Sequence, residues 1–337
     1  MVKALLKFVL VIVVISGCSP ADNPLGLFIK NQDVGPVGQF GSVEYDQSND
    51  SYLITGGGEN MWFALDGFHF LYKEMAGDLS LAADIKFVND GGNTHKKAGV
   101  MIRQDLDTDA AYADVVIHID GHASLQYRAE KGAETHTISV SADAPDRLRV
   151  EKNGSTITES IANTGEEFKP GGASLQMEFT APFYVGLGVC AHDSTVLEQT
   201  IFTNVTIDTA LVISHAESVL ESAIETISVA SGDRRVIHYA YDHFESPHYT
   251  PSGDSLIYNA GGHLYKIPVG GGITKIVNTG SANGIINYHG YSPDGKTLVI
   301  TDTTNQNYAM IYTLPAMGGE PTLITEFGPW YLAWLVT

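Results

Sequence analysis

The stretch Tyr291–Asp302, "YSPDGKTLVITD", combines a turn signal with an alternating apolar run, and an earlier stretch, "YTPSGDSLIYN" at 249–259, repeats it. A proline, a glycine and a leucine recur at a constant offset of 42 residues: Pro251 and Pro293, Gly253 and Gly295, Leu256 and Leu298. In such turns proline fixes φ, Asp or Ser caps the turn, and glycine adopts a positive φ between two strands. A period near 42 with several short strands per unit is typical of propeller blades. The sequence therefore predicts two consecutive β repeats.

Residues 222–337, which contain both stretches, resemble the TolB-type β-propeller repeat family. The resemblance rests on "ASGDRRVIHYAYDHFESPHYTPSGDSLIYNAGGHLYKIP" as one blade, and on "NYHGYSPDGKTLVITD" with "IYTLPAMGGEP" as the next. Relatives commonly carry Asn-Asp-His-Gly before the turn, whereas this chain has Tyr288 in place of the acid and then His289. His289 is thus the histidine to test for a propeller-borne activity, but the missing acid weakens a metal or acid–base role. A histidine buried inside a blade is the preferred interpretation.

A third repeat would be expected where the sequence ends. Trp334, in "GPWYLAWLVT", falls 43 residues after Tyr291, and another turn should follow it, but Thr337 is the last residue. Closed propellers have about four to eight blades. We expect an incomplete propeller of about two blades. We expect a chain shortened relative to its relatives; the alternative is two blades that pack on the preceding domain as an appendage.

Residues 25–207 alternate short apolar runs with Gly, Asn, Asp and Pro clusters, which predicts about ten strands in one two-sheet sandwich or jelly roll. This region resembles the concanavalin A-like, laminin-G-type jelly rolls of bacterial surface proteins, through "GDLSLAADIKF", "KAGVMIRQD", "YADVVIHIDGHASLQYR" and "FYVGLGVCAHD … TIFTNVTI". The resemblance implies a fold whose members often bind glycans, sometimes cleave them, and sometimes only pack against neighbours. Residues 208–221 are expected to be a linker. The predicted fold class is all-β.

The N-terminus, "MVKALLKFVLVIVVISGCSP", has two lysines, a short apolar run and the sequence Ile-Ser-Gly before Cys18. The run is shorter than a membrane span and fits a signal peptide. The ending resembles the bacterial lipobox, which implies cleavage and lipidation at Cys18. We therefore expect a signal peptide over 1–18, a tether over 19–24, and a lipid-anchored (palmitate-bearing) protein of the cell envelope. With Cys18 acylated, Cys190 has no disulfide partner and is expected to be a core residue.

The chain has 39 acidic and 19 basic residues, a formal net charge of −20, which argues against nucleic acid as a partner. It contains no phosphate-binding loop, no Gly-x-Ser-x-Gly elbow, no His-Glu-x-x-His pair and no cysteine cluster. We expect no catalytic residues, no metal centre and no cofactor. Asp105, Asp107 and Asp109 alternate like the start of a calcium loop but lack its central glycine and terminal glutamate, so structural Ca²⁺ is the minority alternative.

Strand alternation predicts a polar face on one hairpin of the sandwich. The residues expected to share it are Arg103, Asp114, His118, Gln126 and Arg128, with Trp62 among the candidate aromatic plates. Sugars bind where polar side chains pair with hydroxyls and an aromatic ring covers the apolar ring face. For each residue alone, a solvated face with cross-strand ion pairs is the preferred interpretation. The clustering favours a ligand face.

These observations predict an envelope lipoprotein that binds carbohydrate or another envelope polymer without catalysis, its partners being a glycan or an envelope protein and the membrane. Two alternatives stay open. One is a glycan-degrading hydrolase or lyase, or its remnant. The other is a structural module for protein–protein interaction. Glycosidases on jelly rolls place paired carboxylates close together on one strand, and no convincing pair is present here.

Overall fold

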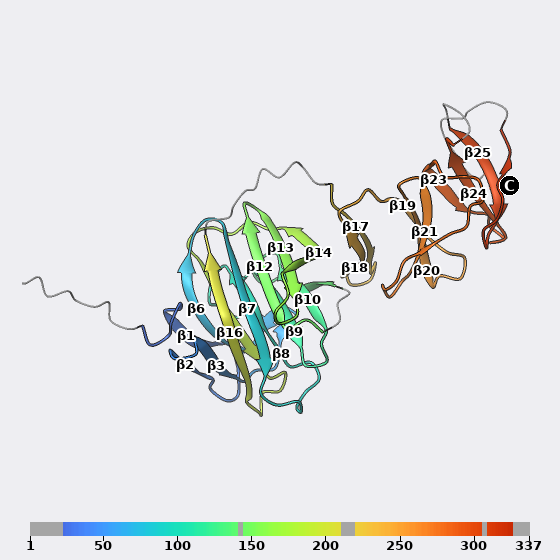
Figure 1. Cartoon of the computed structure of the whole chain (residues 1–337). Helices are drawn as coiled ribbons and strands as arrows, with labels where there is room; N and C mark the ends of the chain where they lie inside the picture. Colours follow the sequence, from blue (N-terminus) through green and yellow to red (C-terminus); the bar gives the residue numbers. More distant parts are fainter. Residues whose placement is uncertain (1–22, 141–143, 210–219, 305–308, 326–337) are drawn as a thin grey trace, which may run out of the picture.

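The computed structural model describes residues 23–140, 144–209, 220–304 and 309–325, and within these ranges every regular element is a strand (Figure 1). The prediction of an all-β fold is confirmed. The expected lipidation site, Cys18, and the expected start of a third repeat at Trp334 lie outside the described residues. Among the residues described, no helix has the length and apolar character needed to cross a membrane.

Two large sheets form the sandwich. One has nine strands, in the order β1 (Lys30–Val34), β6 (Phe68–Met75), β15 (Phe183–Cys190), β8 (Lys97–Arg103), β9 (Tyr112–His118), β10 (Ala123–Arg128), β11 (His136–Ser139), β18 (Arg234–Ala240) and β17 (Ser222–Ile227). The other has seven, in the order β14 (Lys169–Gln176), β13 (Thr156–Ala162), β12 (Arg147–Asn153), β7 (Leu79–Phe87), β16 (Glu198–Asp208), β3 (Ser51–Gly56) and β2 (Ser42–Asp46). A separate two-stranded hairpin, β4 (Met61–Trp62) with β5 (Leu65–Asp66), lies against the nine-stranded sheet.

The main core fills the space between these sheets. Every second residue of β8 and β9 belongs to it, among them Val100, Ile102, Val115 and Ile117. The period-2 alternation of a strand sends the intervening residues to the opposite face of the nine-stranded sheet. That opposite face is also buried in part, by a second apolar cluster that includes Phe68 of β6. The nine-stranded sheet is therefore covered on both sides where the β4–β5 hairpin lies.

Two four-stranded sheets follow the sandwich. The first contains β19 (Glu245–Tyr249), β20 (Ser255–Ala260), β21 (His263–Pro268) and β22 (Lys275–Ile276). The second contains β23 (Ile285–Tyr291), β24 (Thr297–Asp302), β25 (Met310–Pro315) and β26 (Thr322–Leu323). One apolar cluster joins them and includes Ile257 of the first sheet and Ile300 of the second. The prediction of about two blades after a sandwich is confirmed.

The repeated turns have the same hydrogen bonds in both blades. Thr250 N donates to Ser255 O and Gly253 N to Thr250 O, and the equivalent bonds in the second blade run from Ser292 N to Thr297 O and from Gly295 N to Ser292 O, all at 2.8–2.9 Å. The two glycines have φ of 73° and 68°. A Cβ on Gly295 would lie 2.9 Å from Pro251 Cβ, so the two turns touch. The 42-residue period in the sequence thus corresponds to turns stacked side by side.

These two glycines give a matched pair of substitutions. Gly253→Ala meets no atom within 4 Å and should cost only the strain of a positive φ, about 1–2 kcal/mol. Gly295→Ala adds a collision with Pro251 and should destabilise the blades more. Urea unfolding of the full chain measures the difference. Equal losses in the two variants would show that the blades do not stack through these turns.

The hairpin β17–β18 lies between the sandwich and the blades (Figure 1). β18 pairs in parallel with β11, through Ile138 with Arg234 and Ser139 with Arg235, and so extends the nine-stranded sheet. Its other side packs on the first blade, because Ile237 shares a small core with Leu256 and Ile267. Residues that sequence similarity groups with the first blade therefore also contact the sandwich. The boundary expected at residues 208–221 stays a prediction.

Candidate functional site

The face of the nine-stranded sheet turned away from the main core carries rows of side chains across β8, β9 and β10, and two of these rows hold predicted residues. Arg103 lies beside Tyr112 and Tyr112 beside Arg128, while Met101, Asp114 and Gln126 form the adjacent row. The predicted alternation therefore places Arg103, Asp114, His118, Gln126 and Arg128 on one face. All of these except His118 are at most 3% exposed, because the β4–β5 hairpin covers them.

Asp66 of the hairpin binds both arginines. Its carboxylate accepts hydrogen bonds from Arg103 at 2.6 Å and from two nitrogens of Arg128 at 2.8 Å. Arg128 also donates to the carbonyl oxygens of Phe63 and Ala133, and Arg103 donates to a carbonyl oxygen of the 105–109 loop. One carboxylate thus faces two buried guanidinium groups, a geometry that holds the hairpin on the sheet.

Asp114 and Lys97 lie next to this cluster. Burial raises the pKa of Asp114 well above its usual value and lowers that of Lys97. The Lys97 ammonium donates to Met61 O and Gln126 Oε1, each at 3.3 Å, and lies 5.5 Å from the centre of the Trp62 ring. The expectation that Arg103, Asp114 and Arg128 face a ligand is not met. A hairpin folded back from residues 61–66 covers them, and strand alternation alone does not reveal such a cover.

A cavity of about 370 Å³ opens beside the hairpin and is reached by some of the predicted residues. Trp62, His118 and Gln126 line it. The other lining residues are Asn60, Phe63, His95, Lys97, His122, Thr137 and His192. Three of the six predicted ligand residues therefore meet here, together with three further histidines that sequence reasoning missed.

The four histidines come from three separate segments. His118 ends β9, and His122 follows it across a tight turn closed by the bond from Gly121 N to His118 O. Their rings lie 5.7 Å apart between centres, and His95 lies 6.0 Å from His118 and 5.3 Å from His192. The "HIDGH" turn is a sequence signal that pairs His118 with His122. No local signal brings His95 and His192 to the same place, because 97 positions separate them in the chain.

Two buried polar contacts hold the outer histidines. Lys96 is fully buried, pairs with Glu198 at 2.9 Å and donates to Asn89 O at 2.7 Å, which fixes the loop that carries His95. Asn93 donates to His192 O at 2.9 Å and so ties this loop to the segment after β15. His192 itself has a φ of 54°. The cavity wall is thus built on ion pairs and hydrogen bonds within the sandwich.

Three of the cavity histidines, His118, His122 and His192, have lowered pKa values. The pKa of His118 is lowered to about 3, first by burial and then by the charges of Lys97 and His122. Burial also lowers the pKa values of His122 and His192, and for His192 the next cause is Lys97. Burial thus favours the neutral imidazole at these three positions.

Several polar atoms around the cavity have no protein partner. Asn60 Oδ1, Thr137 Oγ1 and His192 Nδ1 are buried and make no hydrogen bond within the described part of the chain. Leaving such an atom unpaired costs about 1–3 kcal/mol, and folded proteins rarely do so. Three such atoms lie around this one cavity.

Phe63 stands at the rim with unusual geometry. Its side chain is 63% exposed and its φ is 54°, a left-handed conformation that is strained for a bulky residue. Phe63 also lines a second hollow of about 390 Å³, which shares Asn60 and His192 with the first. Leu65, 61% exposed, lines the second hollow as well. The exposed Phe63 thus lines both hollows.

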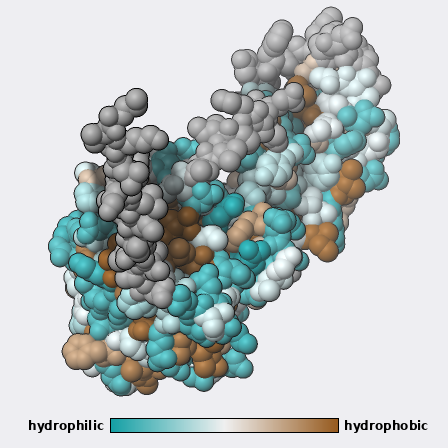
Figure 2. Space-filling view, turned by 60° about the vertical axis from the view of Figure 1, so that its left-hand side comes forward, coloured by the Kyte–Doolittle hydropathy of each residue, from teal (hydrophilic) through white to brown (hydrophobic). Residues whose placement is uncertain are grey.

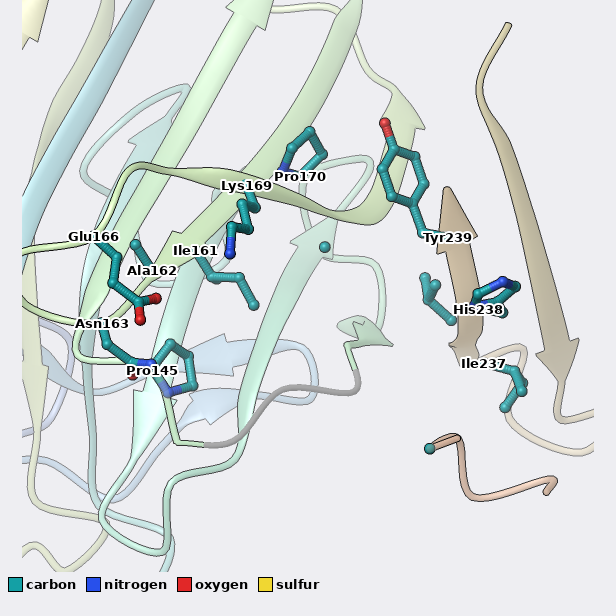
Figure 3. Close-up of a pocket in the computed structure, with 13 residues that line it drawn as sticks. Pro145, Ile161, Ala162, Asn163, Glu166, Lys169, Pro170, Ile237, His238 and Tyr239 are labelled. Atoms are coloured by element: carbon teal, nitrogen blue, oxygen red, sulfur yellow. The ribbon is translucent and has the colours of Figure 1, made fainter. Parts of the chain in front are cut away.

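Another cleft, of about 440 Å³, separates the β13–β14 edge of the sandwich from β18 (Figure 3). Lys169 and Glu166 lie on the sandwich side of this cleft and Tyr239 on the other. The His238 ring stacks on Phe244 at 4.8 Å and so belongs to the packing of the first blade. This cleft combines partly exposed polar residues from two modules, and it lacks the strained aromatic rim of the histidine-lined cavity.

On the face that Figure 2 shows, hydrophilic residues dominate and apolar residues form small separate patches.

His289 lies in β23, at the contact between the two blades. It is 4% exposed and its ring centre is 5.3 Å from that of His248 in the preceding blade. Burial and then the His248 charge lower its pKa to about 4. Its position agrees with the interpretation of a histidine inside a blade.

The three alternating aspartates of the 105–109 loop gather around Lys131. The Lys131 ammonium lies 3.2 Å from Asp105 and 3.7 Å from Asp109, and it also donates to Asp107. Hydrogen bonds to these carboxylates raise the pKa of Lys131. Across the described ranges, no three His, Cys, Asp or Glu side chains are arranged to hold a metal ion.

No model of a known protein family matches the chain. A stretch of 113 residues, 33% of this chain, is 35% identical to an uncharacterized protein of Agrobacterium fabrum and covers 39% of that protein. The chain therefore spans about two fifths of the length of this relative.

Among solved structures, a protein of Agrobacterium tumefaciens assigned provisionally as TolB is 35% identical over 32% of this chain and 39% of its own, with a TM-score of 0.31. The carbohydrate-binding module CBM66 of Bacillus subtilis is 14% identical over 53% of this chain and 95% of its own, with a TM-score of 0.36. A β-glucanase of Bacillus licheniformis is 9% identical over 52% of this chain and 90% of its own, with a TM-score of 0.34. At these TM-scores the fold assignment rests on the strands and sheets described above.

Proposed function

We propose that the sandwich binds carbohydrate, without catalysis, in the histidine-lined cavity beside the β4–β5 hairpin. One observation carries the proposal: the exposed, strained Phe63 stands over a cavity edged by three buried polar atoms that lack protein partners. A sugar suits this combination. Its hydroxyl groups donate and accept hydrogen bonds, and its apolar ring face stacks on an aromatic plate.

The two hollows on either side of Phe63 extend the proposal from a single sugar to a polymer. They share Asn60, Phe63 and His192, so a ligand that crosses the Phe63 ring would occupy both. An oligosaccharide should accordingly bind more tightly than its monosaccharide. Affinity electrophoresis of the full chain through gels that contain acidic and neutral polysaccharides tests the proposal, and the absence of retardation in every gel would contradict it.

We further propose that Cys18 carries a lipid that tethers the protein to a membrane of the cell envelope. The support is the sequence around Cys18, where a basic start, an apolar run and a Ser-Gly pair precede the cysteine. Two acyl chains give stable anchoring, because each buried methylene contributes about 0.8 kcal/mol. Metabolic labelling with palmitate should mark the wild-type protein and not Cys18→Ser.

A further inference from the structure

The described residues that line the proposed carbohydrate site include basic side chains but no acidic ones. Four histidines and Lys97 line the cavity, and no acidic side chain is among the lining residues. The histidines are neutral N–H donors, and Lys97 is the one charged side chain among the described lining residues. Attraction between unlike charges at a partly desolvated site is much stronger than in bulk water. A neutral sugar would gain nothing from this attraction.

The acidic groups that face this cluster lie behind or beside it. Asp120 acts on His118 and His122, and Glu59 acts on His192. Asp114 acts on Lys97, and burial raises the pKa of Asp114 and favours its neutral acid. The further cation Arg235 acts on His122. None of these acidic side chains lines the cavity itself, whereas Glu59 and Asp66 line the second hollow.

We infer that the cavity selects an acidic polysaccharide, placing a carboxylate or sulfate of the glycan among His95, His118, His192 and Lys97. The inference rests on the proposed carbohydrate function and adds the charge of the ligand to it. The imidazoles contribute N–H donors around the anion, and the Lys97 ammonium contributes charge from the cavity floor. Burial first, and the charge of Lys97 second, keep His118 and His192 neutral in the free protein, and an anion beside them favours their charged form.

Proton uptake accompanies such binding. An anion raises the pKa of each nearby histidine, so the complex holds more protons than the free protein, and affinity increases as the pH falls. Because the pKa of free His118 is about 3, the effect appears only when the ligand raises it toward the working range. A rise of about three units in one histidine strengthens binding about tenfold between pH 8 and pH 5.

The experiment is titration calorimetry of the full chain, in detergent, with three oligosaccharides of equal length: an oligogalacturonate, a sulfated oligosaccharide and a neutral gluco-oligosaccharide. We expect the acidic ligands to bind at least about tenfold more tightly than the neutral one at pH 5. Binding of the uronate, the sulfated ligand or both identifies the anionic group. Repeating the titration in buffers of different ionisation enthalpy should reveal net proton uptake.

His118→Gln and His192→Gln should flatten the pH dependence, whereas the control His243→Gln, on an exposed loop before β19, should leave it intact. Equal, pH-independent affinity for neutral and acidic ligands would overturn the inference and leave the proposed carbohydrate function standing. Failure of all three ligands at every pH would instead overturn the carbohydrate function, and the inference with it.

Discussion

Replacing Asp66 with asparagine should lower the free energy of unfolding of the sandwich by about 3–5 kcal/mol, because the change leaves two buried guanidinium groups without a counter-charge. Arg103 and Arg128 are both fully buried, so water does not compensate the loss. Asparagine keeps the size of the side chain, which separates the loss of charge from a loss of packing. Urea unfolding of the full chain measures the effect.

Loosening of the hairpin should also expose Cys190. Its buried Sγ lies 3.4 Å from Gly67 O, at the foot of the hairpin, and burial raises its pKa to about 11. In Asp66→Asn this thiol should react faster with an alkylating reagent, as followed by mass spectrometry of the peptide that contains it.

The matched control is Asp105→Asn, which removes a carboxylate from the exposed ion pair with Lys131. Exposed pairs contribute little, so this variant should unfold at the wild-type midpoint. Asp66→Asn with wild-type stability and wild-type Cys190 reactivity would show that the two arginines do not depend on Asp66.

Replacing Phe63 with glycine should weaken polysaccharide binding by more than about tenfold and leave stability unchanged or slightly raised. The ring is 63% exposed, so its removal costs little packing, and glycine adopts a φ of 54° without strain. Relief of that strain, about 1–2 kcal/mol, offsets the greater flexibility of glycine in the unfolded chain. Affinity electrophoresis and urea unfolding of the same preparation test both parts.

Leu65→Ala provides the comparison, since Leu65 is similarly exposed but lines only the second hollow. It should weaken binding less than the Phe63 substitution. A stable Phe63→Gly variant that binds as well as wild type would remove Phe63 from the site. A variant that unfolds would show that the ring supports the fold instead.

The turns of the two blades could be predicted from the repeat in the sequence. The proline, glycine and leucine at a 42-residue offset predicted two equivalent turns, and the structure has the same hydrogen bonds at both. Turn chemistry is local, since φ at Gly253 or Gly295 depends on a few neighbouring residues. The sequence did not predict the pairing of β18 with β11. This parallel contact involves only two residue pairs, which produce no repeated pattern in the sequence.

Only part of the candidate site could be predicted from the sequence. Alternation along β9 and β10 placed Asp114, His118, Gln126 and Arg128 on one face, as the structure shows. Alternation assigns a residue to a face but does not tell whether another segment covers that face. Residues 61–66 cover most of this face, and Asp66 in this segment pairs with Arg103 and Arg128. Only the edge of the polar face lines the cavity.

The sequence by itself determined the all-β class, the repeated turns and the alternating faces, because each follows from interactions between residues close together in the chain. Only the tertiary structure decided which charges are buried and which histidines meet. Asp66 reaches Arg128 across 62 positions and His95 reaches His192 across 97, and contacts over such separations depend on how the sheets stack and where a hairpin folds back. Local sequence patterns do not predict contacts between residues so far apart in the chain, and the cavity is made by such contacts.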